Sequence, residues 1–404
     1  MQNEPETVFF ISSTFKGGTM LRAVKEMGCY VLLLTEESLR DNPWPMDVID
    51  EIFFTPDLAQ YRDVTHTVSY LNRGRHIHCI VPLDEFEVEI AAMLREHLRI
   101  PGTGVTQTRR FRDKLVMREV ADAAGIPVPP FVSVKNYDDL RAYMDRVAAP
   151  WVLKPRSEAS AMGIRKIEEP EQLWRALDDL GDNQSYYLLE QFLPGSVYHV
   201  DSIIVDGEVV FVTPQMYGAP PMQVYQGGGV FTSRVLRPDS DDATTLRAIN
   251  ERVIHTLGMQ NGVAHTEFIK AHADGNFYFL ESAARVGGAH LSDLIAQATG
   301  IDLWEEWGRL EVAAMRSETY TLPEVKRQGG GLLMTLAKQQ HPDLSAYDDA
   351  EVVWKADKAY HAGLIVVSDN FDRVDALLDS YSGRFAQDFM TSADPWGPQR
   401  TGTN

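Results

Sequence analysis

The most informative part of the sequence reads GVAHTEFIKAHADGNFYFLESAARVGG and spans residues 262–288. Residues 263–269 and 277–281 are rich in aromatic and other apolar residues, a composition that favours two strands. The polar residues around Asp274 and Gly275 between them predict a tight turn. The pattern therefore predicts an antiparallel hairpin.

Two glutamates face each other in this predicted hairpin. With a three-residue loop centred on Asp274, Glu267 lies opposite Glu281, and strand alternation puts His265 on the same face as Glu267. Directly opposed carboxylates repel each other, and a bound divalent cation would remove that repulsion. Hard oxygen ligands suit magnesium. We therefore predict Glu267 and Glu281 as ligands of Mg²⁺, with Mn²⁺ as a substitute; two solvated glutamates on an exposed face are the alternative.

The residues after Glu281 lead into a predicted amphipathic helix, which begins after Gly287 and Gly288. Glycines at the start of a helix expose backbone N–H groups to an anion, and Arg285 adds a cation beside them. We predict that Arg285, Gly287 and Gly288 bind phosphate or substrate. A surface salt bridge is the alternative role for Arg285.

Two lysines occupy places that suit a nucleotide site. Lys154 ends a predicted buried strand, residues 151–154, where a charge is costly unless it meets a partner. The small and hydroxyl residues that follow, 156–164, predict a flap over phosphates. Asp113 is the expected cap of a helix over residues 113–124, and Lys114 beside it would face a phosphate; a solvated lysine is the alternative.

A third segment suits an adenine ring. Residues 187–190 form a predicted apolar strand that ends in Glu190, and irregular backbone follows through Gln191, Phe192 and Leu193. Backbone edges beside apolar side chains are what an adenine ring requires. A strand that simply ends at a Pro-Gly turn fits the same residues equally well.

The first hundred residues alternate between strand and helix patterns, which predicts an α/β fold with a parallel sheet. Strands are expected at residues 7–11, 30–34 and 78–81, and helices at 19–27, 61–71 and 86–98. Residues 100–104 resemble a linker. Further on, residues 197–205 and 208–213 predict a hairpin around Asp206 and Gly207, and a last α/β segment begins near Gly329.

Composition narrows the class of protein. Among 404 residues, 38 Lys and Arg stand against 58 Asp and Glu, so the net charge is −20. This balance opposes nonspecific binding to nucleic acid or anionic lipid. No apolar run approaches the roughly 18–20 residues of a membrane span. The acidic N-terminus does not read as a signal peptide, and the two cysteines form no disulfide framework, so a cytoplasmic protein is expected.

These segments follow one another in the order seen in the ATP-grasp superfamily of carboxylate–amine ligases. The sequence resembles that family over roughly residues 5–400, with the specific motifs between residues 113 and 288. The resemblance implies an α/β ATP-grasp fold with an N-terminal parallel-sheet domain, a small lid subdomain and a C-terminal α/β segment. The implied division is an N-terminal α/β domain at 1–105, a linker helix and lid at 106–195, a catalytic subdomain at 196–325 and a C-terminal α/β subdomain at 326–404.

The resemblance also implies which residues bind ATP. Residues 152–155 resemble the second ATP lysine motif, 157–163 the phosphate flap and 190–193 the adenine hinge, and His199 lies near where biotin-carboxylase-like members contact the nucleotide. The implied set is Lys114, Lys154, Ser157, Ser160, Met162, Gly163, Glu190, Gln191, Phe192, Leu193 and His199. Many members carry Asn two residues after the second metal glutamate, where this chain has Ala283, so the metal would rest mainly on Glu267 and Glu281.

Within the superfamily the sequence is most similar to bacterial L-amino acid ligases, on residues 153–163, 265–267 and 281–285. The implied reaction uses ATP to phosphorylate a substrate carboxylate and releases ADP, after which an amine displaces phosphate. Arg285 would stabilise the acyl phosphate and the oxyanion, and His265 would orient substrate or accept the amine proton.

Two alternatives stay open: a ligase or carboxylase with another nucleophile, and a noncatalytic ATP-binding regulator. The expected partners are a small carboxylate and a small amine, with a homodimer left open. The substrate pocket is expected where the N-terminal sheet meets the metal hairpin. Residues 217–221 and 226–229 are candidate loops over it, and both could equally be ordinary connections.

Overall fold

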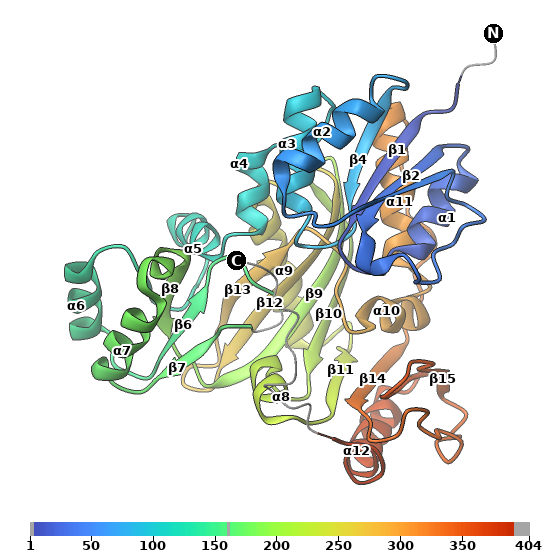
Figure 1. Cartoon of the computed structure of the whole chain (residues 1–404). Helices are drawn as coiled ribbons and strands as arrows, with labels where there is room; N and C mark the ends of the chain where they lie inside the picture. The colour runs from blue at the N-terminus through green and yellow to red at the C-terminus, as the bar shows by residue number, and fades with distance from the viewer. Residues whose placement is uncertain (1–3, 160–161, 392–404) are drawn as a thin grey trace.

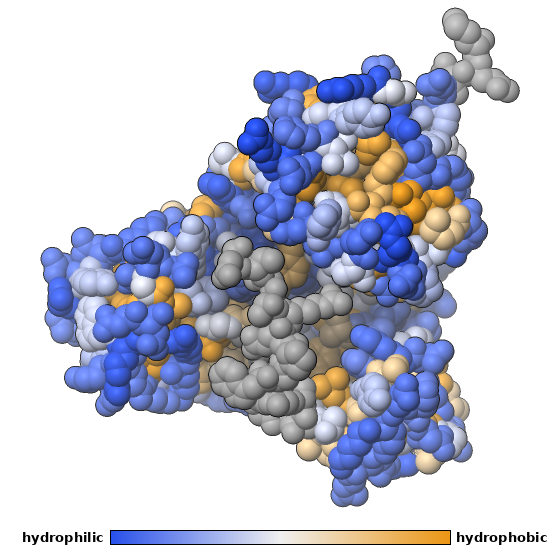
Figure 2. Space-filling model, viewed as in Figure 1, coloured by the Kyte–Doolittle hydropathy of each residue, from blue (hydrophilic) through white to orange (hydrophobic). Residues whose placement is uncertain are grey.

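The structure is a computed structural model that describes residues 4–159 and 162–391, with the backbone alone at residues 225–227. Its strands form three sheets, and Figure 1 shows how these are arranged: the N-terminal domain and a small lid stand at two ends of a large central sheet. In the space-filling view, three lobes with mainly hydrophilic surfaces surround a recess (Figure 2).

The N-terminal domain is built on a parallel sheet, as predicted. Its strand order is β3-β2-β1-β4, and β3 is not among the predicted strands. Its central strand is apolar throughout because both faces are covered: Val8 and Phe10 pack with helix α1, while Phe9 and Ile11 pack with α2 and α3. The elements are β1 (Thr7–Ser12), α1 (Gly18–Glu26), β2 (Tyr30–Glu36), β3 (Glu51–Thr55), α2 (Tyr61–Leu71), β4 (Ile77–Pro82) and α3 (Val88–Leu98).

The lid is an antiparallel sheet of order β5-β8-β6-β7. Strands β6 and β8 pair at its centre, which brings Lys154 and Glu190 onto neighbouring strands. The lid elements are β5 (Phe131–Ser133), α6 (Tyr137–Arg146), β6 (Trp151–Pro155), β7 (Arg165–Ile167), α7 (Pro170–Leu180) and β8 (Tyr187–Gln191).

The central sheet has eight strands in the order β13-β12-β9-β10-β11-β14-β16-β15, and neighbouring strands are antiparallel. The boundary predicted at residue 326 falls inside this sheet, because β14 pairs with β11. The strands are β9 (Gly195–Val205), β10 (Glu208–Tyr217), β11 (Phe231–Val235), β12 (Gly262–Ala271), β13 (Phe277–Ala283), β14 (Gly329–Leu336), β15 (Val352–Lys355) and β16 (His361–Ser368).

Helices cover the central sheet and join it to the other parts. Helices α5 and α9 share a core with β9 and β12, and α11 packs against α1 of the N-terminal domain. These elements are α4 (Val105–Thr108), α5 (Lys114–Ala123), α8 (Pro221–Gly227), α9 (Asp241–Leu257), α10 (Leu291–Thr299), α11 (Leu303–Arg316) and α12 (Phe371–Asp388). Within the described residues, no helix has both the length and the apolar character to cross a membrane.

The hairpin of β12 and β13 pairs Glu267 with Glu281, as predicted. The predicted three-residue loop is wrong, because Ala271 N donates to Asn276 O at 3.0 Å and encloses the four residues 272–275. A β-bulge between Glu267 and Phe268 shifts the register by one residue and restores the predicted pairing. The two glutamates therefore lie opposite each other, next to a β-bulge. Such bulges are common beside active sites.

Candidate functional site

A cavity of about 830 Å³ lies between the lid and the central sheet, and most of the predicted site residues line it. It is large enough for a nucleotide and a small substrate together. The predicted residues that line it are Lys114, Lys154, Met162, Glu190, Gln191, Phe192, Leu193, His265, Glu267, Glu281, Arg285 and Gly288.

At the lid side of the cavity, Glu190 is a buried carboxylate held by two cations. Lys154 Nζ lies 2.5 Å from its Oε1, and Arg118 Nε donates to its Oε2 at 3.0 Å. Burial raises the pKa of Glu190, but Arg118 and Lys154 outweigh burial and lower it. Glu190 is therefore an ionised group that fixes Lys154, in addition to its place at the predicted hinge.

Lys154 is only weakly held in its charged form. Its side chain is 7% exposed, and burial lowers its pKa to about 8 even though Glu190 acts in the opposite direction. The strand-end charge anticipated from the sequence thus has a partner, and the cavity supplies room for a second, anionic one. A phosphate group at this position would favour the charged form of Lys154.

Across the cavity, Lys114 pairs with Glu281. Asp113 caps α5 as predicted, accepting from Leu115 N, and the buried Lys114 Nζ lies 2.9 Å from Glu281 Oε2. Lys114 also donates to the carbonyl of Glu158 in the flap, at 2.6 Å. Burial raises the pKa of Glu281, but Lys114 and Lys154 outweigh it and hold the pKa at about 2.

Glu267 meets two protein groups on the facing side of the hairpin. The hydroxyl of Tyr217 donates to Glu267 Oε1 at 2.9 Å, and His265 Nε2 lies 3.6 Å from the same oxygen. Burial raises the pKa of Tyr217 strongly, so its hydroxyl keeps its proton and stays a donor. Residues 217, 218, 220 and 221 of the first candidate loop line the cavity, whereas the described lining includes none of residues 226–229.

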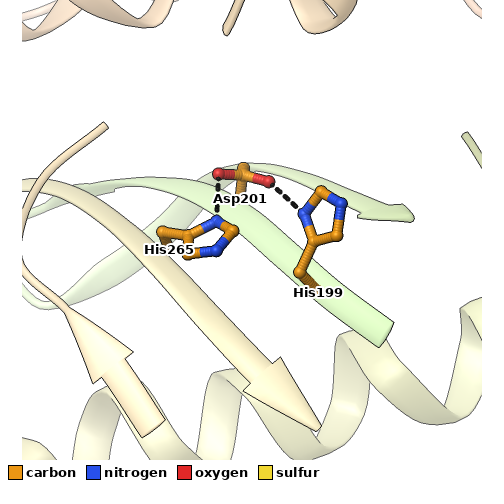
Figure 3. Close-up of side chains that lie close together, drawn as sticks. All are labelled: His199, Asp201 and His265. Carbon is orange, nitrogen blue, oxygen red and sulfur yellow. Dashed lines mark hydrogen bonds and ion pairs between the residues drawn. The ribbon is translucent and has the colours of Figure 1, made fainter. Parts of the chain in front are cut away.

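His265 is a cation rather than a base. Burial lowers its pKa, but Asp201 and Glu267 outweigh burial and raise the pKa to about 10. Its Nδ1 lies 2.9 Å from Asp201 Oδ1 (Figure 3). The expectation that His265 accepts the amine proton is therefore not supported, because the ring is already protonated at neutral pH. A role in orienting substrate remains compatible with its place at the cavity wall.

His199 lies beneath the cavity rather than at its surface. Figure 3 shows the carboxylate of Asp201 between the rings of His199 and His265. His199 Nδ1 is 2.8 Å from Asp201 Oδ2, its Nε2 is 2.8 Å from Ser233 Oγ, and its ring stacks on Tyr217. Because the side chain is fully buried and both nitrogens are occupied, the prediction that His199 contacts the nucleotide is corrected: it supports Asp201 and Tyr217.

Arg285 reaches from the central sheet to the N-terminal domain. Its Nη2 lies 2.8 Å from Glu85 Oε2, and Nη1 donates to the carbonyl of Val286 at 3.0 Å. Burial lowers its pKa, but Glu85 and Asp84 outweigh burial and raise it. The salt bridge considered as an alternative is present, but it is buried and borders the cavity.

The two glycines after Arg285 differ in position. Gly288 lines the cavity, whereas Gly287 packs against the buried pair of Asp201 and His265, where a Cβ would lie 2.9 Å from Asp201 Oδ1. Its missing side chain lets the chain pass over that pair, and Gly287 is not among the residues that line the cavity, so its binding of phosphate or substrate stays a prediction. The helix predicted after these glycines is α10.

Only some residues of the predicted flap, residues 156–164, line the cavity. Met162 and Glu158 line it, whereas Ser157 does not, and Gly163 lies against Pro155 and Tyr187. Ser160 lies outside the described residues. The predicted contacts of Ser157 and Gly163 with ATP are therefore not supported by the lining of the cavity.

All four residues of the predicted hinge, 190–193, line the cavity. Gln191 N donates to Pro130 O and Phe192 N to Pro150 O, at 2.8 and 3.0 Å, which ties the segment to the lid. The apolar side chains of Val152, Ile164 and Leu280 line the same cavity as the hinge, and an adenine ring requires such a surface.

Sequence reasoning missed Arg118 and Asp201. Arg118 follows Lys114 by one helical turn on the buried face of α5, so two cations on the apolar stripe of an amphipathic helix were the available signal. Asp201 alternates with His199 along a buried strand, and two ionisable residues facing the same way in an apolar run were the signal there.

The carboxylate oxygens of Glu267 and Glu281 are suitable ligands for a hard divalent cation. Glu267 and Glu281 both line the cavity, and Glu281 is ionised at neutral pH because of its pKa of about 2. Side chains of the protein already offset part of the repulsion between the two carboxylates, since Lys114 neighbours one of them and the His265 imidazolium the other. The residues fit magnesium through their carboxylate oxygens.

Comparison with known proteins places these features in a family context. Residues 147–293 match the family model of the ATP-grasp domain. Over 256 residues the chain is 25% identical to the L-arginine-specific L-amino acid ligase of Bacillus subtilis, a match that covers 61% of this chain and 60% of that protein. A D-alanine–D-alanine ligase of Neisseria gonorrhoeae is 26% identical over 216 residues, which covers 51% of this chain and 69% of that protein. The chain spans half of the length of the alanine–anticapsin ligase of Bacillus subtilis, which it also matches.

Solved structures share the whole architecture. The crystal structure of an L-amino acid ligase from Bacillus licheniformis matches with a TM-score of 0.73 at 16% identity, covering 96% of this chain and 99% of that one. A biotin carboxylase from Campylobacter jejuni, solved as a β,γ-ATP complex, matches with a TM-score of 0.70 at 16% identity, covering 96% and 92%.

Proposed function

We propose that this chain, which carries an ATP-grasp domain within an ATP-grasp fold, is an ATP-dependent ligase that joins a carboxylate to an amine and releases ADP and phosphate. The carboxylate is proposed to belong to an amino acid. The observation that carries the proposal is the cavity itself, which brings together two glutamates, two lysines and Arg285.

The site residues divide into those for ATP and those for the acyl group. Lys154 and Lys114 would hold phosphate oxygens, and the hinge at Gln191 and Phe192 would hold the adenine. Mg²⁺ on Glu267 and Glu281 would neutralise phosphate charge when it is bound. The chain's own contribution is to position these groups before the reaction, so that little reorganisation is needed.

The chemistry balances in two steps. A carboxylate oxygen of the substrate attacks the γ-phosphorus of ATP, the bond to the bridging oxygen breaks, and ADP leaves. The amine nitrogen then attacks the acyl carbon, phosphate leaves with the bonding electrons, and the proton of the nitrogen passes to the departing phosphate. Arg285 faces the cavity as a fixed cation for the charge that develops on the acyl oxygen.

His265 has a different role in this scheme from that of a base. As an imidazolium held by Asp201, it would orient substrate and keep Tyr217 and Glu267 in place. The relatives named L-amino acid ligase and D-alanine–D-alanine ligase support an amino-acid substrate class.

The test is a screen of amino-acid pairs for substrate-dependent release of ADP, with magnesium present. Release that requires both partners, together with formation of an amide, supports the proposal. An absence of ADP release with every pair, in a protein that binds ATP, would favour a noncatalytic nucleotide-binding role. Release that requires bicarbonate instead would favour the carboxylase alternative.

A further inference from the structure

A second cavity, of about 670 Å³, lies between the N-terminal sheet, residues 101–111 and helix α11. Its walls come from the N-terminal domain on one side and from the central sheet and its helices on the other. It shares no lining residue with the first cavity among the described residues. Its volume is that of a small-molecule site.

One wall carries the carboxylate of Glu311 on α11. Its Oε1 accepts from the indole nitrogen of Trp307 at 2.8 Å, and its Oε2 accepts from Cys79 Sγ at 3.6 Å. Both partners are neutral, because burial also raises the pKa of the Cys79 thiol. In the part of the chain that the structure describes, Glu311 forms no ion pair with a Lys, Arg or His.

The same cavity carries an uncompensated cation. Arg95 on α3 is 9% exposed, and its guanidinium donates only to carbonyl oxygens, those of Ile80 and Thr103. Among residues 4–159 and 162–391 no carboxylate forms an ion pair with it. A guanidinium has five N–H donors, so these bonds do not exhaust Arg95. The nearly buried guanidinium of Arg95 would therefore gain from a ligand that supplies an anionic acceptor, and the half-buried carboxylate of Glu311 from one that supplies a cationic donor.

The rest of the lining is mixed. Phe111, Met259, Val263, Trp307 and Met315 supply apolar surface, and Phe111 and Trp307 are nearly fully buried. Neutral polar side chains, among them Gln107, Gln260 and Asn261, lie beside them. Such a surface suits a ligand with a hydrocarbon body and two ionised ends.

We propose that this second cavity binds a small zwitterion, whose ammonium meets Glu311 and whose carboxylate meets Arg95. Free amino acids and short peptides share this chemistry. The proposal concerns binding, so it stands independently of the ligase reaction.

The position of the cavity connects it with the first one. Ala284 lines the second cavity, and the next residue, Arg285, lines the first. From the other side, Pro82 lines the second cavity, and Glu85, three residues later, pairs with Arg285 at 2.8 Å. Both segments that hold Arg285 therefore also border or adjoin the second cavity.

The experiment is calorimetric titration of the full chain, without ATP, with single amino acids and with dipeptides. The variants are Glu311→Gln, which keeps an acceptor for Trp307, and Ala314→Trp, which fills the exposed edge of the cavity from α11. Glu251→Gln, on the exposed face of α9, is the matched control. Melting temperature and ADP affinity verify that each variant is folded.

We expect a zwitterion to bind the wild type and the control equally, and about tenfold or more weakly to each of the two cavity variants, because a charge-assisted contact or the space itself is lost. Comparing the amino-acid and dipeptide series identifies which source of zwitterion the cavity prefers. If no zwitterion binds the wild type at millimolar concentration, or if binding is unchanged in both Glu311→Gln and Ala314→Trp, the proposal is overturned. Either result leaves the ligase proposal untouched, since that is tested by ADP release.

Discussion

The ammonium of Lys114 lies 2.9 Å from Oε2 of Glu281, so one of the two predicted metal ligands is held by a cation of the protein itself. Lys114 also donates a hydrogen bond to the carbonyl of Glu158 in the flap. A nucleotide and a metal that enter this site would therefore meet Lys114, Glu281 and the flap as one connected group. This connection gives the first prediction.

Glu281→Gln and Glu281→Ala should both lose ADP formation, because neither retains the ionised oxygen that the low pKa of Glu281 secures. Glu281→Gln keeps an acceptor for Lys114, so its melting temperature should stay close to that of the wild type. Turnover and thermal unfolding are measured on the same preparations. Wild-type turnover of Glu281→Gln at saturating magnesium would rule out the metal role.

Lys154→Met should weaken nucleotide binding. Loss of a charge-assisted contact to phosphate is typically worth about 1.5–3 kcal/mol, which is roughly a tenfold to 150-fold rise in Kd. Glu190 remains paired with Arg118 in this variant, so the buried carboxylate keeps a partner. Calorimetry with ADP measures the effect. An unchanged affinity together with an unchanged melting temperature would show that Lys154 does not hold phosphate.

The pH dependence of nucleotide binding should follow Lys154. Its pKa in the free protein is lowered to about 8, so the side chain is charged below that pH and neutral above it. The affinity for ADP should therefore fall as pH rises from 7 to 9, approaching a tenfold loss per pH unit at the upper end. In Lys154→Met this fall should be absent. A wild-type affinity that stays constant over the range would show that the charged lysine does not hold phosphate.

Gly287→Ala should destabilise the fold, because the new Cβ would lie 2.9 Å from Asp201 Oδ1 and 3.0 Å from His265 Nδ1. Overpacking of this kind costs about 1–3 kcal/mol. Gly288→Ala is the matched control, since its Cβ would meet no atom within 4 Å. Thermal or urea unfolding compares the two. Equal stability of both variants would contradict the close packing of Gly287 on the Asp201–His265 pair.

Much of the fold could be predicted from the sequence, because these elements are specified by residues that are neighbours in the chain. The hairpin of β12 and β13 and the parallel N-terminal sheet follow from alternation and from strand-helix order. The bulge after Glu267 carried no such signal, and it restored the predicted pairing even though the turn was longer than expected. The join between β11 and β14 was equally hidden, because it links segments about a hundred residues apart.

Among the residues of the candidate site, too, those marked by a local pattern could be predicted, and those that depend on distant segments could not. Lys154, Glu267 and Glu281 stood out because a charge at the end of a strand, or opposite another charge, is unusual within a short window. The burial of His199 and the ion pair of Arg285 with Glu85 depend on chain segments far apart in sequence. Arg118 shows the intermediate case, since its helical spacing from Lys114 was visible but its partner Glu190 was not.

The central claim is that the site activates a carboxylate as an acyl phosphate, and trapping with hydroxylamine tests it most directly. With ATP, magnesium and an amino acid, hydroxylamine should give a hydroxamate, and the nucleotide product should be ADP with phosphate. Arg285→Ala should suppress the hydroxamate by about 10²- to 10³-fold, the usual effect of losing one oxyanion donor. Formation of AMP and pyrophosphate, or of no hydroxamate in a protein that makes the amide, would contradict the account.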